Sequence, residues 1–419
     1  MPSIKAILDY NQLPSQILNN HQRWKRFILI CFLIRLLFFI SDGHNSDYDF
    51  FEHWGDRIVN NGFTQIYSIQ VDRFECDYPP LYLYVIAPLA YLFNFLGLDM
   101  HTHLYDSFLK LFNLLIECLF LIYISKKFNN KIFLTALIFS PVTILNAYGW
   151  GQIDILYTIL MFIAFYTIYH KQLYIAAISI GLSLSLKTQT ILFLPLLGLM
   201  YLMVRVSIKE KILAILLLSI IYIIPNLPFI LYAPNAMDSI NPHITAAGRY
   251  NNISVNAFNF YWAIWADFDL KMDLKFPPND VLVFNLITRK LLAYTLFSLV
   301  FLWIFFQYIR NFKNETLIFL LLSFFCFSVF ILLPEMHERY LFPMFFFSAY
   351  VLSKDSKEWP YFLIISLLHL INLLWGWGEN KFVKDQWMFE ITRIFAVITG
   401  FVYIAYFRRV YIALKDQKA

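Results

Sequence analysis

The sequence predicts an all-α protein that crosses a membrane about twelve times. Of its 419 residues, 60% are hydrophobic and only 15% are charged, and the mean hydropathy is +0.60. Soluble globular proteins carry nearer a quarter charged residues. Several apolar runs approach the roughly 20 residues that a helix needs to cross the core of a bilayer. The runs do not alternate apolar with polar residues, which argues against the short strands of a membrane barrel.

Thirteen apolar runs divide the chain, and each is a candidate span. The polar stretch before the first run is too long for a signal peptide and no small-residue cleavage site follows it, so we expect the first run to be retained. The runs cover residues 24–41, 79–98, 104–124, 131–148, 152–170, 172–187, 189–205, 211–232, 286–310, 315–333, 340–353, 359–375 and 388–407.

Basic residues set the expected topology, because loops rich in lysine and arginine favour the cytoplasmic side. The basic stretch 23–26 puts the N-terminal end inside. If all thirteen runs crossed, several basic loops would lie outside, and this conflict goes away when the run 79–98 enters the membrane without crossing. That run begins with Pro79 and Pro80 and contains Pro88, which suits a re-entrant or interfacial element. About twelve crossings remain, with both termini cytoplasmic.

This topology leaves two long extracytoplasmic loops, residues 42–103 and 233–285, in a single domain that spans residues 1–419. No internal repeat and no linker rich in glycine, serine or charge divides the chain. We expect an integral membrane protein whose site lies outside the cytoplasm, because every polar cluster that loop connection does not explain falls on that side.

The first outer loop predicts an amphipathic helix. Phe50, Trp54 and Ile58 recur every four residues and share one face, and Asn61-Gly62 follows as a helix end should. Such a helix is typical of a segment that lies on the membrane surface.

Asp47 is the candidate general base. It follows the first span directly, and a carboxylate that faces a partly dry cavity can accept a hydroxyl proton. Ionisable residues at membrane depth are costly and tend to mark function. Asp49 is a candidate substrate-binding residue, with the alternative that it serves only as a helix-capping or solvated charge.

Two further outer clusters offer substrate-binding side chains. Asp77 and Tyr78 precede the two prolines and are expected to line the acceptor side, with the alternative that Asp77 caps the helix that follows. Gln152 and Asp154 would sit at the lip of the next span, with the alternative of a capped turn. We expect Trp150, between two glycines, to be an anchor at the membrane interface.

Cations on this side are expected to meet an anion. Lys187 lies at bilayer depth and is a candidate phosphate ligand, unless its side chain extends to the surface. Arg249, in the asparagine-rich stretch 248–262, is a second candidate phosphate ligand.

The sequence "MHERY" carries the most information. Its loop is short and bounded by proline, so its charges lie at or below the membrane interface. Arg339 offers a planar fork for phosphate, and His337 could donate to the same oxygens. Glu338 could accept sugar hydroxyls or orient Arg339. Glu335 has no role that the sequence indicates.

We expect no cofactor and no metal. Asp47 and Asp49, with His44 nearby, could hold a divalent cation, but hard cations require more oxygen ligands than this stretch offers. The net charge of +5 is explained by cytoplasmic loops rather than by nucleic-acid binding.

Taken together, these residues resemble the polyprenyl-phosphate-sugar-dependent glycosyltransferases of the GT-C class. The nearest pattern is that of the bacterial relatives of the second mannosyltransferase of GPI-anchor assembly. The dolichyl-phosphate-glucose-dependent glucosyltransferases of N-glycan assembly are similar more distantly. The matching motifs, in chain order, are Asp47 ahead of His53-Trp54, Asp77 to Pro80, Gly151-Gln152, Lys187 with Gln189, and His337-Glu338-Arg339.

The resemblance implies a GT-C fold and an inverting transfer of a hexose, with mannose favoured. The donor would be a polyprenyl-phosphate sugar and the acceptor a glycan or glycolipid hydroxyl, at the outer face of a bacterial plasma membrane. Our hypothesis is that Asp47 acts as the base and that Arg339, His337 and Lys187, which lie in the matching motifs, form a phosphate site with Arg249, which the residues alone indicate. The expected substrate-binding residues are Asp49, Asp77, Tyr78, Gln152, Asp154, Gln189 and Glu338.

Two other classes of function remain open from the residues. A transporter or flippase of a lipid-linked or anionic substrate would show inverted repeats and polar elements near the membrane midplane, and neither is evident. A glycan ligase that uses a lipid-diphosphate donor would be expected to carry a larger late outer loop and more arginines on that side.

Overall fold

The computed structural model describes residues 21–39, 43–68, 74–128, 130–245, 248, 250–268, 274–378 and 386–416. Within these ranges the chain is helical nearly throughout, and its β structure is limited to three two-stranded sheets with strands of two residues. The expected all-α class is therefore confirmed.

Each of the thirteen apolar runs coincides with a helix or with a pair of helices. The helices are α3 (His21–Phe39), α5 (Leu83–Phe95), α6 (His103–Phe128), α7 (Lys131–Ile138) with α8 (Pro141–Ile144), α9 (Asp154–Tyr169), α10 (Leu173–Leu186), α11 (Leu194–Met203), α12 (Ile208–Tyr232), α15 (Arg289–Arg310), α16 (Glu315–Leu332), α17 (Met344–Leu352), α18 (Trp359–Trp377) and α19 (Gln386–Asp416).

Helix length and composition support a membrane protein. In the described part of the chain, six helices are long and apolar enough to cross a bilayer, namely α6, α12, α15, α16, α19 and the stretch Ser356–Trp377 that contains α18. A seventh span results if α7 and the helix Pro141–Trp150, which are bent by 45°, count together. The other expected crossings fall on shorter helices, such as α9 and α10.

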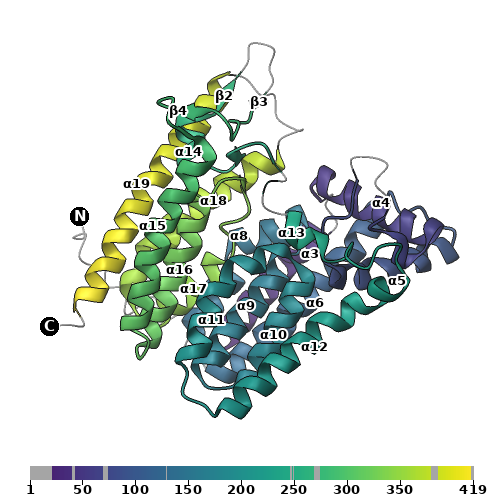
Figure 1. Ribbon diagram of the computed structural model, residues 1–419, viewed down its shortest axis with the longest axis horizontal. Coiled ribbons are helices and arrows are strands. Elements are labelled where there is room, and N and C mark those ends of the chain that lie inside the picture. The colour runs from purple at the N-terminus through teal and green to yellow at the C-terminus, as the bar shows by residue number, and fades with distance from the viewer. Residues whose placement is uncertain are drawn as a thin grey trace.

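The helices form two groups that lie side by side (Figure 1). The purple-to-teal group contains α3 to α12, and the green-to-yellow group contains α14 (Phe260–Trp265) to α19. Helix α16 is apolar on all sides and 89% of its best span is buried, whereas the corresponding values for α12 and α15 are 22% and 17%. A helix that is hydrophobic all round and exposed belongs against lipid, so α16 forms the core and α12 and α15 face outward.

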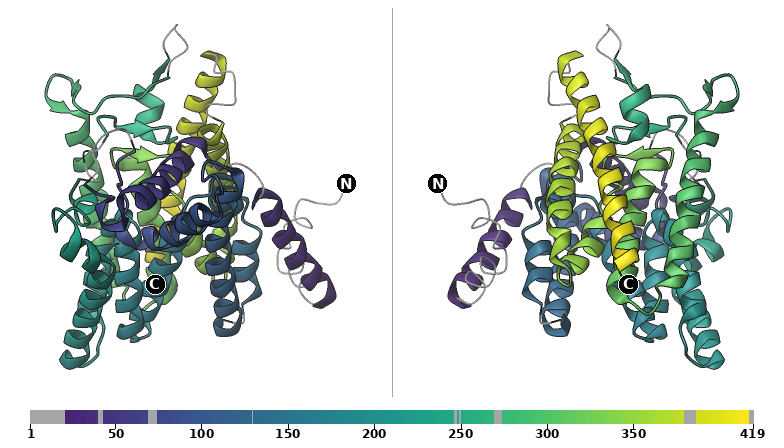
Figure 2. Two further views of the ribbon diagram at one scale, coloured as in Figure 1. Left: turned by 90° about the vertical axis from the view of Figure 1, so that its right-hand side faces the viewer. Right: turned by 90° about the vertical axis from the view of Figure 1, so that its left-hand side faces the viewer.

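The segment after the first apolar run, residues 42–103, contains the expected amphipathic helix, α4 (Asn45–Asn61). Trp54 and Ile58 are buried, and the helix ends at Gly62, whose φ is +95° and whose N–H donates to the Ile58 carbonyl at 3.0 Å. The apolar face packs against α5, which is preceded by the 3₁₀ turn η2 (Pro80–Tyr82). In Figure 2, α4 (purple) lies level with the upper ends of the blue helices, and the yellow C-terminal helix extends above it.

The long segment between α12 and α15 is paired with the segment between α16 and α17. Strand β1 (Ser254–Val255) pairs in parallel with β6 (Met336–His337). Asn372 of α18 fastens the same loop, because its side chain accepts from the Phe258 N–H at 2.9 Å and donates to the Asn256 carbonyl at 2.6 Å. The loop therefore holds a defined position over His337.

Candidate functional site

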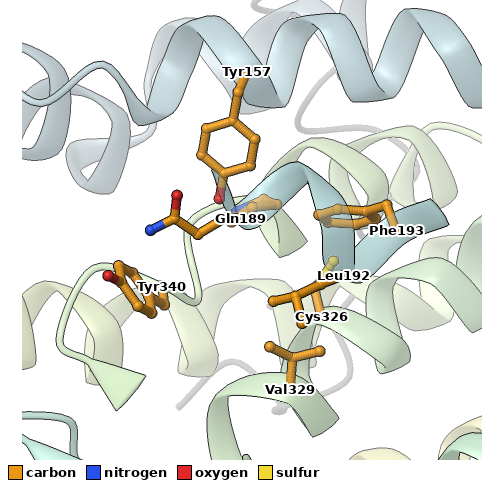
Figure 3. A pocket seen from close by; sticks show the side chains of 8 residues that line it. Tyr157, Gln189, Leu192, Phe193, Cys326, Val329 and Tyr340 are labelled. Atoms are coloured by element: carbon orange, nitrogen blue, oxygen red, sulfur yellow. The ribbon is translucent and has the colours of Figure 1, made fainter. Parts of the chain in front are cut away.

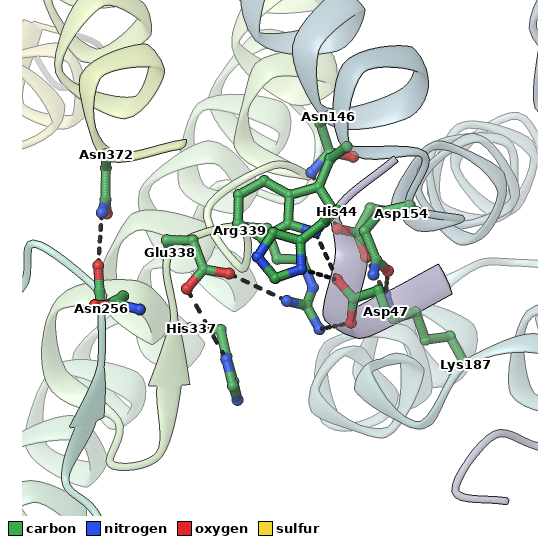
Figure 4. Close-up of polar contacts among 12 residues, drawn as sticks. His44, Asp47, Asn146, Asp154, Lys187, Asn256, His337, Glu338, Arg339 and Asn372 are labelled. Carbon is green, nitrogen blue, oxygen red and sulfur yellow. Dashed lines mark hydrogen bonds and ion pairs between the residues drawn. The ribbon is translucent and has the colours of Figure 1, made fainter. Parts of the chain in front are cut away.

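The candidate base, Asp47, lies where the two helix groups meet. It sits in the first turn of α4 with its side chain 21% exposed. The indole Nε1 of Trp150 donates to its Oδ2 at 2.5 Å, and Nδ1 of His44 lies 3.5 Å from the same oxygen. Arg339, from the loop before α17, places its guanidinium 3.8 Å from Oδ1 (Figure 4).

Arg339 is shared between two carboxylates. It donates to Glu338 at 3.1 Å and forms the longer ion pair with Asp47. Its guanidinium lies 5.9 Å from the ring of Trp150 and 5.6 Å from the ring of Tyr340. Its Nε is buried and has no hydrogen-bond partner among the described residues. One donor of the guanidinium is thus unused within that part of the chain.

These neighbours keep Asp47 ionised. Burial acts to raise the pKa of Asp47, but Arg339, then His44 and then hydrogen bonds from Trp150 and Gln152 act in the opposite direction and bring it from an ordinary 3.8 to about 2. An opposite charge and hydrogen bonds to the charged form both favour ionisation. The carboxylate is therefore charged at neutral pH and weakly basic.

His337 lies on the same side of the site as Arg339 but is uncharged. Its ring contacts those of Tyr250 and Tyr340, and its Nδ1 lies 4.0 Å from Glu338. Burial and the nearby Arg339 hold the pKa of His337 well below its usual range, so the imidazole is neutral. Its Nε2 is buried and has no partner in the described part of the chain.

A second polar network lies beside the first. Lys187 forms a close ion pair with Asp154, and these two side chains are only 2% and 1% exposed. Asn146 donates to the other oxygen of Asp154 at 3.1 Å. The Gln152 side-chain oxygen accepts from the Tyr78 hydroxyl at 3.1 Å and from Lys187 at 3.4 Å. Lys187, expected at a phosphate, is therefore occupied by a carboxylate of the protein.

The backbone between α8 and α9 explains how Trp150 and Gln152 reach the site. Residues Leu145–Trp150 form a π-helix, η3, a wide turn that is frequent at functional sites. Gly151 ends it in the left-handed region, with φ +85°, and a Cβ there would lie 2.0 Å from the Tyr48 hydroxyl oxygen. The Gln152 N–H then donates to the Asn146 carbonyl at 3.0 Å. Glycine is required at position 151 because both conformation and space demand it.

Several expected site residues lie apart from the cluster formed by Asp47, Trp150, His337, Glu338 and Arg339. Asp49, two positions after Asp47 on α4, points from another face of the helix. Asp77 is half-buried beside Tyr78. Gln189 lines a small apolar pocket with Tyr157 and Tyr340, next to the cluster (Figure 3). Arg249 lies outside the residues that the structure describes.

The structure places two residues, Trp150 and Glu335, in contacts that the sequence did not indicate. Trp150 is 1% exposed, so its expected role as an interface anchor is wrong: its ring packs inside the protein and stacks on His44 at 4.3 Å. Glu335 has positive φ (+62°) and binds Lys290 at 2.6 Å and the Gly248 N–H at 2.8 Å. The glycines on either side of Trp150 are the signal of close packing that the sequence offers.

The described residues contain no group of three or more histidine, cysteine or acidic side chains placed to hold a metal ion. Comparison of the chain with models of known protein families and with curated proteins finds no match. The arrangement itself offers a charged carboxylate, a guanidinium whose Nε–H is unpaired among the described residues and a neutral imidazole whose Nε2 is likewise unpaired there.

Proposed function

We propose that the protein is an inverting GT-C glycosyltransferase that moves a hexose, with mannose favoured, from a polyprenyl-phosphate donor to an acceptor hydroxyl. The proposal includes twelve crossings, cytoplasmic termini and a site on the outer face of a bacterial plasma membrane. The observation that carries it is the meeting of Asp47 with Arg339 and His337, where Nε of Arg339 and Nε2 of His337 are buried without partners among the described residues.

Unused buried donors indicate a ligand that accepts hydrogen bonds. A buried N–H without a partner is costly, and the Nε–H of the Arg339 guanidinium, with the imidazole of His337 beside it, suits the oxygens of a phosphate. The neighbouring pocket lined by Gln189, Tyr157 and Tyr340 is largely apolar. A phosphate that carries an apolar chain matches both features and explains why the site lies among helices suited to a membrane.

In the reaction, Asp47 accepts the proton of the acceptor hydroxyl as its oxygen attacks the anomeric carbon. The bond from that carbon to the donor phosphate breaks, and the polyprenyl phosphate leaves with the electron pair. Arg339 and His337 donate to the phosphate oxygens, where negative charge grows in the transition state. The leaving phosphate is stable as an anion, so no general acid is needed.

The ion pair between Asp47 and Arg339 sets the order of events. A carboxylate with a pKa of about 2 is a weak base. When the donor phosphate binds the guanidinium of Arg339, the ion pair between Arg339 and Asp47 weakens. The pKa of the Asp47 carboxylate then rises, and it becomes a stronger base. The donor would therefore bind before the acceptor is deprotonated.

Charge balance points to His337 as the adjustable group. The two networks hold two cations, Arg339 and Lys187, against the three carboxylates of Asp47, Glu338 and Asp154. An incoming phosphate adds negative charge, which favours the protonated form of His337. Donor binding would then be accompanied by proton uptake.

The test is a transfer assay on purified full-length protein with a panel of short-chain polyprenyl-phosphate sugars, read by release of polyprenyl phosphate. We expect Asp47→Asn to lower the rate on the order of 100- to 1000-fold. Asp99→Asn removes an exposed carboxylate of the same outer segment and serves as the control.

Three results would contradict the proposal. Near-normal transfer by the Asp47→Asn variant would show that Asp47 is not the base. Release from a diphosphate donor alone would favour the ligase. Uptake of a lipid-linked sugar into proteoliposomes, with no release from any donor, would favour the transporter.

A further inference from the structure

Trp150 contacts both the carboxylate of Asp47 and the guanidinium of Arg339 in the candidate site. Its Nε1 donates to Asp47 at 2.5 Å, and its ring faces the guanidinium of Arg339, which lies 5.9 Å from the ring centre. The ring also stacks on His44 at 4.3 Å and an interplanar angle of 12°. Asp47 and Arg339 come from distant parts of the chain, and the one indole lies against both.

Gly376 of α18 is the residue against which this indole packs. A Cβ at position 376 would lie 2.8 Å from Cη2 of Trp150 and 2.7 Å from Cγ of Glu338. Both distances are too short for real contacts, and the indole ring is rigid. Glycine is a poor helix former, so its presence inside α18 fits a need for space. Residues 345–419 carry no motif of the resemblance, yet α18 reaches the site here.

We propose that Trp150 is a positioning residue that fixes Asp47 and Arg339 relative to each other, and that Gly376 provides the space in which it does so. This inference rests on the proposed function for its kinetic consequences, whereas its geometric content is independent of that function. The indole N–H of Trp150 fixes the carboxylate of Asp47 by a directional hydrogen bond. The face of the same ring limits how closely the guanidinium of Arg339 can approach that carboxylate.

Replacing the indole of Trp150 by a phenyl ring separates the effect of its hydrogen bond to Asp47 from the effect of filling space in the core. Trp150→Phe keeps an aromatic ring but removes the N–H donor. We expect the transfer rate at saturating donor to fall about 10- to 100-fold, with KM for the donor changed by less than about threefold. The acid limb of the pH–rate profile should move to higher pH, because a hydrogen bond to the charged form of Asp47 has been lost.

The matched control is Trp262→Phe. Trp262 is also fully buried, and its Nε1 likewise donates to a side chain, that of Thr392 at 2.9 Å, but it lies in α14 and touches no described residue of the cluster. We expect this variant to lose thermal stability as Trp150→Phe does, with the pH–rate profile unmoved. Equal shifts in the two variants would show a structural role only.

Gly376 is tested by a double-mutant cycle. Gly376→Ala should lower the rate about tenfold or more in the natural background, because the new methyl group displaces Trp150 and Glu338. In the Trp150→Phe background the clash with the indole is absent and only that with the Glu338 side chain remains, so the same change should cost clearly less than in the natural background. Gly400→Ala is the control, since a Cβ at Gly400 of α19 meets nothing within 4 Å. Additive losses would overturn the assignment of Gly376.

Fluorine NMR of protein labelled with fluorotryptophan tests the geometry without any substrate. The resonance that disappears in Trp150→Phe belongs to Trp150, and it should shift in both Asp47→Asn and Gly376→Ala. The resonance assigned through Trp262→Phe should stay in place in both. An unmoved Trp150 resonance would overturn this inference even if transfer is measured, and shifted resonances without transfer would leave the inference standing while the proposed function fails.

Discussion

At the scale of single residues, the site depends on how each charge is compensated. Asp47 is held by Arg339, His44 and the Trp150 N–H, and Lys187 is held by Asp154. A buried ion pair that loses one partner leaves an uncompensated charge, which is far more destabilising than loss of the whole pair. The prediction for Lys187 uses this asymmetry.

Asp47 should make the folded protein sensitive to acid. Its pKa is lowered from 3.8 to about 2 on folding, so its contribution is fully present above about pH 4 and is lost as the pH falls through 2. The contribution is about 2 kcal/mol, from about 1.4 kcal/mol per pKa unit. Thermal unfolding of the detergent-solubilised protein between pH 2 and pH 7 should therefore show a smaller stability loss in Asp47→Asn than in the natural chain.

The same measurement has a clear opposite outcome. If the acid-induced loss of stability were the same in Asp47→Asn as in the natural protein, the carboxylate would not be paired in the folded state. The exposed Asp99→Asn variant should follow the natural chain throughout.

Lys187 should act on stability more than on donor affinity. Lys187→Met leaves Asp154 buried without its cation, and we expect a loss of about 3–5 kcal/mol in unfolding free energy. The double variant Lys187→Met/Asp154→Leu should recover much of that loss. Thermal unfolding and donor KM are measured on all three proteins.

A different pattern would restore the phosphate-binding role expected of Lys187 from the sequence. In that case Lys187→Met would raise the donor KM strongly with little change in stability, and the Asp154→Leu change would bring no recovery.

At the scale of elements, the turn after the π-helix η3 is the most constrained part of the site. Gly151 needs a positive φ and has no room for a Cβ beside Tyr48. Gly62, at the end of α4, has a similar φ of +95°, but a Cβ there would meet nothing within 4 Å. The two glycines therefore separate backbone strain from steric exclusion.

Alanine substitution at these two positions should give unequal results. Gly62→Ala should cost about 1–3 kcal/mol, because φ +95° with ψ +149° is a backbone conformation that residues with a side chain rarely adopt. Gly151→Ala adds a clash with Tyr48, the residue that follows Asp47 in α4. It should therefore abolish most transfer activity and lower the melting temperature further than Gly62→Ala does. Equal melting temperatures and equal activity for the two variants would show that Tyr48 moves aside freely.

Most elements could be predicted from the sequence, because long apolar runs and caps such as Asn61-Gly62 are local signals. The contact between α4 and α5 is not local, and the expectation of a helix lying on the membrane surface did not include it. The 45° bend before α8 precedes Pro141, which disfavours helix at the residue before it.

The site shows the same division. Asp47, His337, Glu338 and Arg339 are evident from their cost at membrane depth, and the structure brings them together. The pairing of Lys187 with Asp154 depends on how α10 packs on α9, which no local pattern encodes. A tryptophan near a helix end looks the same in sequence whether it faces lipid or, like Trp150, the interior.

At the scale of the whole molecule, the two helix groups share one site. Asp47 and Trp150 belong to the purple-to-teal group, and Arg339 and Gly376 belong to the green-to-yellow group (Figure 1). Apolar side chains cover the outward faces of α12, α15 and α19. A lipid environment is the setting in which such faces are stable, so the relation between the groups and the membrane can be tested directly.

Cysteine labelling tests the proposed topology. In a chain freed of its four natural cysteines, Asp99→Cys should react with a membrane-impermeant maleimide on intact cells. Lys127→Cys, at the opposite end of α6, should react only after the membrane is opened. Both positions are exposed, so access depends on the membrane alone. Labelling of Lys127→Cys on intact cells would reverse the orientation.

The short pairing of β1 with β6 has a consequence for control of the protein from outside. Val255 and His337 share a backbone register, and Asn372 clamps the next turn of the same loop. The ring of Tyr250 in the same loop also contacts the imidazole, so backbone pairing and side-chain packing together couple this loop to His337. If the proposed function holds, an antibody fragment that displaces this loop should lower the transfer rate without entering the site.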